Sequence, residues 1–113
     1  MTTSAYIVFL QARHELDVQT LFGLPADERE LLEIVAVHAA KAKPLTVSQF
    51  MGLIHLASPA TLHRKLTNLL EARMIVLTHE GKNRRTKYIH PSEFAMDYFR
   101  SACAALATVK EAA

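Results

Sequence analysis

Residues 45–66, LTVSQFMGLIHLASPATLHRKL, contain two helix starts that decide the fold. Within this stretch TVSQ, residues 46–49, forms a capping box, in which the Thr46 hydroxyl and the Gln49 side chain each satisfy a backbone N–H at a helix start. We expect a short helix from this point to about residues 55–56. Apolar residues at helical spacing predict its inward side. They are Val47, Phe50, Met51 and Ile54.

A second helix start follows after a tight turn. Ser58 is a strong N-cap residue, and Pro59 suits the first helical position because that position needs no backbone N–H. The expected helix reaches about Ala72 and buries one stripe of leucines, Leu62, Leu66 and Leu69. Two short helices joined by a tight turn form a helix-turn-helix.

A basic hairpin is expected directly after these helices. Residues 74–79, MIVLTH, and residues 85–90, RTKYIH, are rich in strand-forming residues, and EGKN at residues 80–83 provides turn chemistry. The hairpin tip carries three cations, Lys82, Arg84 and Arg85. A helix-turn-helix followed by such a hairpin predicts a winged helix-turn-helix.

Three further helices are expected around this arrangement, over residues 4–21, 25–40 and 92–109. The expected fold class is therefore mainly α with a small β-hairpin wing, an α+β winged helix-turn-helix. We expect one domain over residues 1–113, because the chain is too short for a second domain of ordinary size. The first helix is apolar on too many sides for a lone surface helix, which suggests that part of it packs on another subunit.

Positive charge is concentrated in one third of the chain. Residues 58–90 carry seven basic and two acidic side chains, whereas residues 1–57 carry four basic and six acidic ones. Such clustering is typical of a phosphate-binding surface. On the helix that starts at Ser58, the side opposite the leucines is small, polar and basic, as entry into a DNA major groove requires. The outward residues are Ala60, Thr61, Arg64, Thr67, Asn68 and Glu71, with His63 and Lys65 at the flanks.

Three segments together resemble the winged-helix core of the MarR family of bacterial regulators. They are LTVSQF at residues 45–50, SPATLHRKL at residues 58–66 and NRRTKYI at residues 83–89. The similarity covers about residues 24–92. It implies a dimeric regulator of transcription, most commonly a repressor, that binds double-stranded DNA, and it is compatible with regulation by a small-molecule effector. The expected cytoplasmic location follows separately from the lack of a signal segment and of a membrane-length apolar run.

The helix pattern, the charge and the resemblance together give two sets of candidate site residues. The DNA-binding set is Ser58, Ala60, Thr61, His63, Arg64, Lys65, Thr67, Asn68, Lys82, Arg84, Arg85 and Lys87. The resemblance implies that the terminal helices, 4–21 and 92–109, pair across a two-fold axis. The candidate dimer interface is Tyr6, Phe9, Leu10, Phe94, Tyr98 and Phe99.

Other chemistries find little support in the sequence. The six histidines include no pair four residues apart, and Cys103 is the single cysteine, so we expect no metal site, cofactor or intramolecular disulfide. No nucleophile with a base partner and no phosphate-binding glycine loop appears, so we expect no enzyme. We also expect no signal segment and no membrane span. Two alternatives stay open, a winged-helix module that binds another protein and a plasmid or replication factor that binds DNA.

Overall fold

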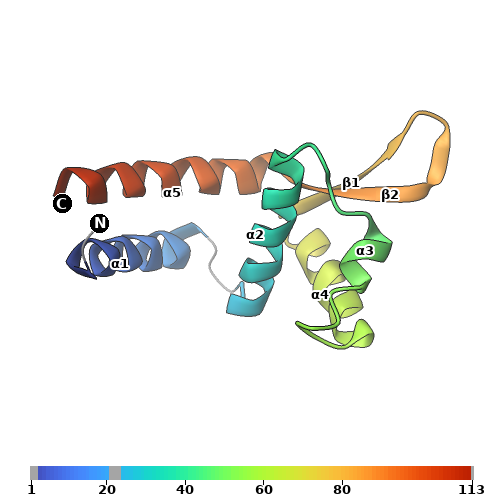
Figure 1. The fold of residues 1–113 in the computed structure, drawn as a ribbon, viewed down its shortest axis with the longest axis horizontal. Helices are drawn as coiled ribbons and strands as arrows, with labels where there is room; N and C mark the ends of the chain where they lie inside the picture. The colour runs from blue at the N-terminus through green and yellow to red at the C-terminus, as the bar shows by residue number, and fades with distance from the viewer. Residues whose placement is uncertain (1–2, 21–23, 113) are drawn as a thin grey trace. The chain divides into compact units, whose positions relative to one another are not determined.

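The computed structural model describes residues 3–20 and 24–112, which form five helices and a two-stranded sheet (Figure 1). The elements in chain order are α1 (Thr3–Thr20), α2 (Ala26–Ala40), α3 (Val47–Met51), α4 (Pro59–Glu71), β1 (Ile75–Glu80), β2 (Asn83–Pro91) and α5 (Glu93–Ala112). The predicted helical fold with one hairpin is confirmed. The predicted end of the first helix at residue 21 lies outside the described residues.

The chain divides into two compact units. One unit is Pro25–Ala95, and the other combines residues 1–24 with residues 96–113. The single-domain organisation stays a prediction.

The capping box at the start of α3 has the predicted geometry. The Thr46 hydroxyl accepts a hydrogen bond from the Gln49 backbone N–H at 3.1 Å, and the Gln49 side chain accepts one from the Thr46 N–H at 2.9 Å. The predicted inward position of Ile54 is wrong, because α3 ends at Met51 and Ile54 lies in the following turn with 69% of its surface exposed. Helical spacing no longer applies to a residue beyond the helix end.

Helix α4 has a defined start and a defined stop. Ser58 caps its start by accepting a hydrogen bond from the Thr61 N–H at 3.2 Å. At its end Arg73 takes a left-handed conformation, with φ of 60°, and Met74 donates its N–H to the Leu69 carbonyl at 3.0 Å. This is the Schellman arrangement, which satisfies carbonyls that the helix leaves unbonded. The chain is thereby turned from α4 directly into β1.

The core of the unit Pro25–Ala95 is formed where α2, α3, α4 and the sheet meet. The predicted leucine stripe of α4 is buried. Burying a leucine or phenylalanine side chain contributes roughly 1.5–3 kcal/mol, so these contacts dominate the stability of the unit. The core residues of this unit are Leu31, Leu32, Val35, Leu45, Phe50, Leu62, Leu66, Leu69, Met74, Ile75, Ile89 and Ala95.

Strands β1 and β2 pair antiparallel, and β2 also contacts the segment before α3. Leu77 pairs with Ile89 and Thr78 with Tyr88, while Thr46 forms an isolated bridge with Tyr88 on the other edge of β2. The base of the hairpin therefore belongs to the helical core, whereas its tip extends beyond α3 and α4 (Figure 1).

The second unit contains α1 and most of α5. The Tyr98 hydroxyl donates a hydrogen bond to the Asp17 carboxylate, and Arg13 lies over the Phe9 ring at 5.6 Å from its centroid. Tyr6 and Ile7 of α1 remain exposed to solvent. Among the described residues, no helix combines the length and the apolar character that a membrane crossing needs.

Candidate nucleic-acid interface

The exposed side of α4 carries most of the predicted base-reading residues. Ala60, His63, Arg64 and Thr67 are exposed, and Thr61 is half-buried. Because Ser58 and Pro59 fix the first turn, the helix presents its N-terminal half with small and polar side chains outward. Such a surface allows close approach to base edges, and the helix N-terminus favours a phosphate oxygen.

The three hydroxyl groups on this side of α4 already make local hydrogen bonds. Ser58 Oγ donates to Thr61 Oγ1 at 3.0 Å, and Thr67 Oγ1 donates to the His63 carbonyl at 3.1 Å. A hydroxyl oxygen has two lone pairs, and the local bonds use at most one of them, so each oxygen can still accept a bond from a base. The local bonds fix where these oxygens lie before any ligand arrives.

Lys65 and Asn68 do not face outward with the others. The structure ties both to α2, where Glu28 Oε2 accepts hydrogen bonds from Lys65 Nζ and from Asn68 Nδ2, each at 3.1 Å. Lys65 Nζ also lies 3.0 Å from a carboxylate oxygen of Asp27. We call these four residues, Asp27, Glu28, Lys65 and Asn68, the Glu28 cluster. The sequence pattern predicts that Asn68 points outward, whereas in the structure its side chain is directed toward Glu28 of α2.

Charge within the Glu28 cluster is compensated. The Lys65 ammonium, through its hydrogen bond to Asp27, lowers the pKa of that carboxyl below its ordinary value of 3.8. The hydrogen bonds from Lys65 to Asp27 and to Glu28 raise the pKa of Lys65 above 10.5. Lys65 is therefore held as a cation, but the carboxylates of Asp27 and Glu28 on α2 neutralise its charge, so it is not available to bind a phosphate.

The hairpin tip is a two-residue turn with an uneven ladder behind it. Gly81 has φ of 51°, a left-handed value that glycine adopts without strain. The ladder is regular as far as Thr78 and Tyr88 and resumes at Glu80 and Asn83. Between those two pairs β1 has one residue and β2 has four, residues 84–87. The extra residues of β2 carry three of the hairpin's cations, Arg84, Arg85 and Lys87.

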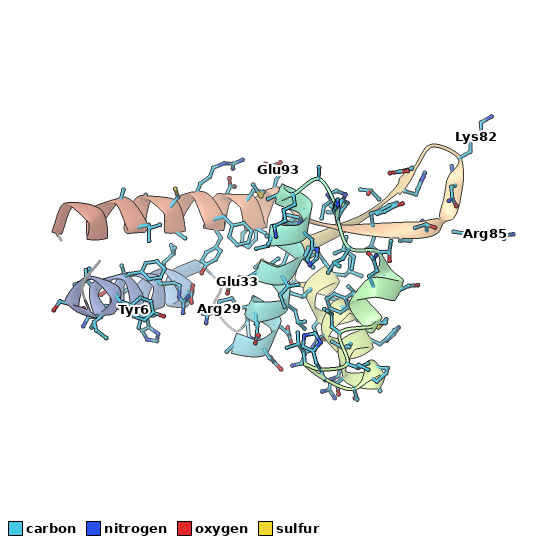
Figure 2. All side chains as sticks on the ribbon, viewed as in Figure 1. Tyr6, Arg29, Glu33, Lys82, Arg85 and Glu93 are labelled. Carbon is cyan, nitrogen blue, oxygen red and sulfur yellow. The ribbon has the colours of Figure 1, made fainter. Side chains whose placement is uncertain are left out.

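These cations extend away from the body of their unit. Lys82, Arg84 and Arg85 are exposed, and Lys87 is half-buried. Figure 2 shows the side chains of Lys82 and Arg85 pointing outward from the tip. Within residues 3–20 and 24–112, no carboxylate forms a salt bridge with any of these four or with Arg64. The wing therefore presents uncompensated positive charge.

The predicted dimer residues differ in how far their side chains are exposed. Tyr6 and Phe94 are exposed, and Phe9, Leu10 and Phe99 are half-buried. Tyr98 differs, because it is only 3% exposed and its hydroxyl contacts α1 of its own chain. A side chain covered in this way offers no surface to a second subunit.

No other site emerges from the described residues. No group of three or more His, Cys, Asp and Glu side chains is placed to hold a metal ion in that part of the chain. Cys103 is exposed on α5 and forms no disulfide. The sequence interpretation did not single out Asp27 or Glu28 as site residues. No signal in the sequence pairs them with residues 37 to 40 positions later.

Comparison with known proteins finds structural but not sequence similarity. No protein-family model matches the sequence, and no curated protein matches it. Among solved structures, Rv1404 from Mycobacterium tuberculosis superposes with a TM-score of 0.67 at 15% identity, over 93% of this chain and 68% of that one. YusO from Bacillus subtilis superposes with a TM-score of 0.58 at 16% identity, over 96% of this chain and 72% of that one.

A third similar structure is MepR, a transcription regulator of the Staphylococcus aureus multidrug efflux pump MepA. It gives a TM-score of 0.60 at 14% identity, over 99% of this chain and 82% of that one. A variant of MepR has been solved bound to an oligodeoxyribonucleotide. Rv1404, YusO and MepR are members of the MarR family. The chain therefore has the winged-helix fold of the MarR-family regulators.

Proposed function

We propose that this protein is a regulator of transcription that binds double-stranded DNA through α4 and the wing. The observation that carries the proposal is the pairing of two surfaces in one unit. An exposed polar helix side with Arg64 is followed by a hairpin whose cations have no acidic partner in the described chain. The DNA-bound MepR variant, which shares the fold, supports the same use of it.

The two surfaces suit different parts of a DNA duplex. Helix α4 fits the major groove, where Arg64 can donate two hydrogen bonds to the acceptors of guanine. The wing reaches the neighbouring minor groove or its phosphates, where negative potential favours arginine. The proposed DNA surface is Ser58, Ala60, Thr61, His63, Arg64, Thr67, Lys82, Arg84, Arg85 and Lys87. Lys65 and Asn68 are left out, because both bind Glu28.

We further propose a homodimer that represses transcription by occupying a promoter. The exposed apolar side chains of α1, Tyr6 among them, are the surface that a second copy would cover (Figure 2). A dimer places two α4 helices in successive major grooves of a palindromic site. The residues proposed for the contact are Tyr6, Phe9, Leu10 and Phe99 in the second unit, together with Phe94 at the start of α5. A small-molecule effector would act by changing the spacing of the two helices.

DNA binding is tested with a duplex selected by the wild-type protein from a random pool, compared with a scrambled duplex. Lys82→Ala should weaken both duplexes equally and reduce the slope of log affinity against log salt by about 0.9, the value for one lost phosphate contact. Arg64→Ala should reduce discrimination between the two duplexes by about 1–3 kcal/mol. Lys41→Ala, which removes an exposed cation at the C-terminal end of α2 and outside the proposed DNA surface, is the matched control.

Wild-type affinity in both variants at low salt would refute the DNA surface. The dimer is tested separately by light scattering after size exclusion. Tyr6→Glu should give monomers, whereas Val37→Glu should leave the dimer intact, although Tyr6 and Val37 are equally exposed at 53%. A monomeric wild-type protein at micromolar concentration would refute the dimer.

A further inference from the structure

The Glu28 cluster joins α2 to α4 by polar contacts inside an otherwise apolar interface. Glu28 lies in the first turn of α2, and its side chain is only 4% exposed. Lys65 and Asn68 reach it from one side of α4, and the Lys65 side chain is 13% exposed. A single carboxylate oxygen, Glu28 Oε2, accepts both hydrogen bonds.

Stability alone does not require such an arrangement. Taking a carboxylate and an ammonium out of water costs about as much as their attraction returns, so apolar residues of similar size are often as stabilising. The neighbouring contacts of Leu31, Leu32, Leu62 and Leu69 already bury the two helices against the core. What the polar cluster adds is a fixed orientation of α4. Hydrogen bonds to one oxygen tolerate little rotation of the helix, whereas leucine contacts are compatible with several packings.

The cluster fixes the rotation of α4 about its own axis, and this rotation orients the proposed DNA surface. Lys65 and Asn68 are three residues apart and so lie on one side of α4, and each follows directly after a predicted base-reading residue, Arg64 and Thr67. Rotation of the helix by 20° would move side-chain tips at a radius of 5–6 Å by about 2 Å. A shift of that size breaks a bidentate contact with a base.

We infer that Glu28 is the positioning residue of α4: by holding Lys65 and Asn68 it sets the rotation at which Arg64 and Thr67 meet the bases. This inference rests on the proposed DNA-binding function. Glu28 itself touches no DNA, and the cluster governs discrimination between sequences more than overall affinity.

The test uses the full chain with two paired substitutions that leave the net charge unchanged, so that attraction to phosphates is also unchanged. The first pair is Glu28→Leu with Lys65→Met, and the second is Glu28→Gln with Lys65→Gln. The matched control is Arg29→Gln with Glu33→Gln, an ion pair with N···O 3.5 Å on the same helix (Figure 2). Circular dichroism checks folding, and titrations give the ratio of the affinities for the selected and the scrambled duplex.

We expect this ratio to fall about tenfold in the folded variants, with affinity for the scrambled duplex unchanged and the control pair at the wild-type ratio. A wild-type ratio in any folded variant would overturn the inference. So would an equal loss for both duplexes, or failure of both variants to fold, because each outcome makes the cluster a stability element only. Failure of the wild-type protein to select any duplex would instead refute the proposed function, before any variant is made.

Discussion

Ile89 of β2 donates its backbone N–H to the Leu45 carbonyl across 2.8 Å, which joins the wing to the segment just before α3. Both side chains belong to the core, and Ile89 is fully buried. The bond continues the contact of β2 with Thr46, the residue that caps α3. The wing and the helix-turn-helix are thus anchored at the same place, and their relative position depends on buried groups rather than on the charges at the tip.

This anchoring predicts the effect of Ile89→Ala. Removing a fully buried isoleucine leaves a cavity and should cost roughly 2–5 kcal/mol of unfolding free energy. Val76→Ala, in the exposed part of β1, is the control and should cost less than about 1 kcal/mol. Urea denaturation followed by circular dichroism measures both. Equal midpoints for the two variants would contradict the shared anchoring.

Ser58 allows capping to be separated from DNA binding. Ser58→Ala should cost about 1 kcal/mol, because the Thr61 N–H loses its acceptor. Ser58→Asp should keep the wild-type stability, since aspartate caps as well as serine, but its negative charge should weaken DNA binding. Thermal unfolding and duplex titration provide the two readouts. An Asp variant with wild-type DNA affinity would remove Ser58 from the proposed surface.

A single substitution in the Glu28 cluster should be far more damaging than the paired ones. Lys65→Met leaves the Glu28 carboxylate buried without its cation, which costs roughly 3–5 kcal/mol. Arg100→Met breaks an exposed pair with Asp97 on α5 and should cost less than about 1 kcal/mol. Chemical denaturation compares the two. Similar losses in both would mean that Glu28 is hydrated rather than buried.

The lowered pKa of Asp27 predicts a pH dependence of stability. A carboxyl with a lower pKa in the folded state adds stability above its ordinary value of 3.8, and this is lost as the pH falls through the folded-state pKa. Wild type should therefore be more stable than Asp27→Asn at neutral pH, by a small amount because Asp27 is exposed, and the difference should vanish in acid. Denaturation curves from neutral to acidic pH test this, and a constant difference would contradict it.

Local chemistry made much of the fold predictable. The start of α3 depends on Thr46 and Gln49, and the start of α4 on Ser58 and Thr61, and the two residues of each pair are three positions apart. The hairpin depends on one turn. Such signals are contained in short stretches of sequence, so the helix-turn-helix and the wing could be identified. The exposed cations of the wing followed from the same local pattern.

Contacts between distant residues could not be predicted in this way. The helical wheel treats a polar residue as outward-facing, which held for Arg64 but not for Asn68, because Glu28 provides a buried acceptor that no local pattern reveals. The early end of α3 was missed for a related reason. Ile54 continues the apolar spacing in the sequence, but the chain has already left the helix at Gly52.

The uneven hairpin has a practical consequence for protein engineering. Regular pairing extends only from the base to Thr78 and Tyr88, and the four residues of β2 beyond it face a single residue of β1. The space around Gly81 is open, because an added Cβ would meet nothing within 4 Å, but its φ of 51° favours glycine, so Gly81 itself should be kept and only its neighbours changed. The tip is therefore a place where a peptide tag or a fluorescent label should be accommodated without loss of folding. The signal of such a label would change when the wing binds a ligand.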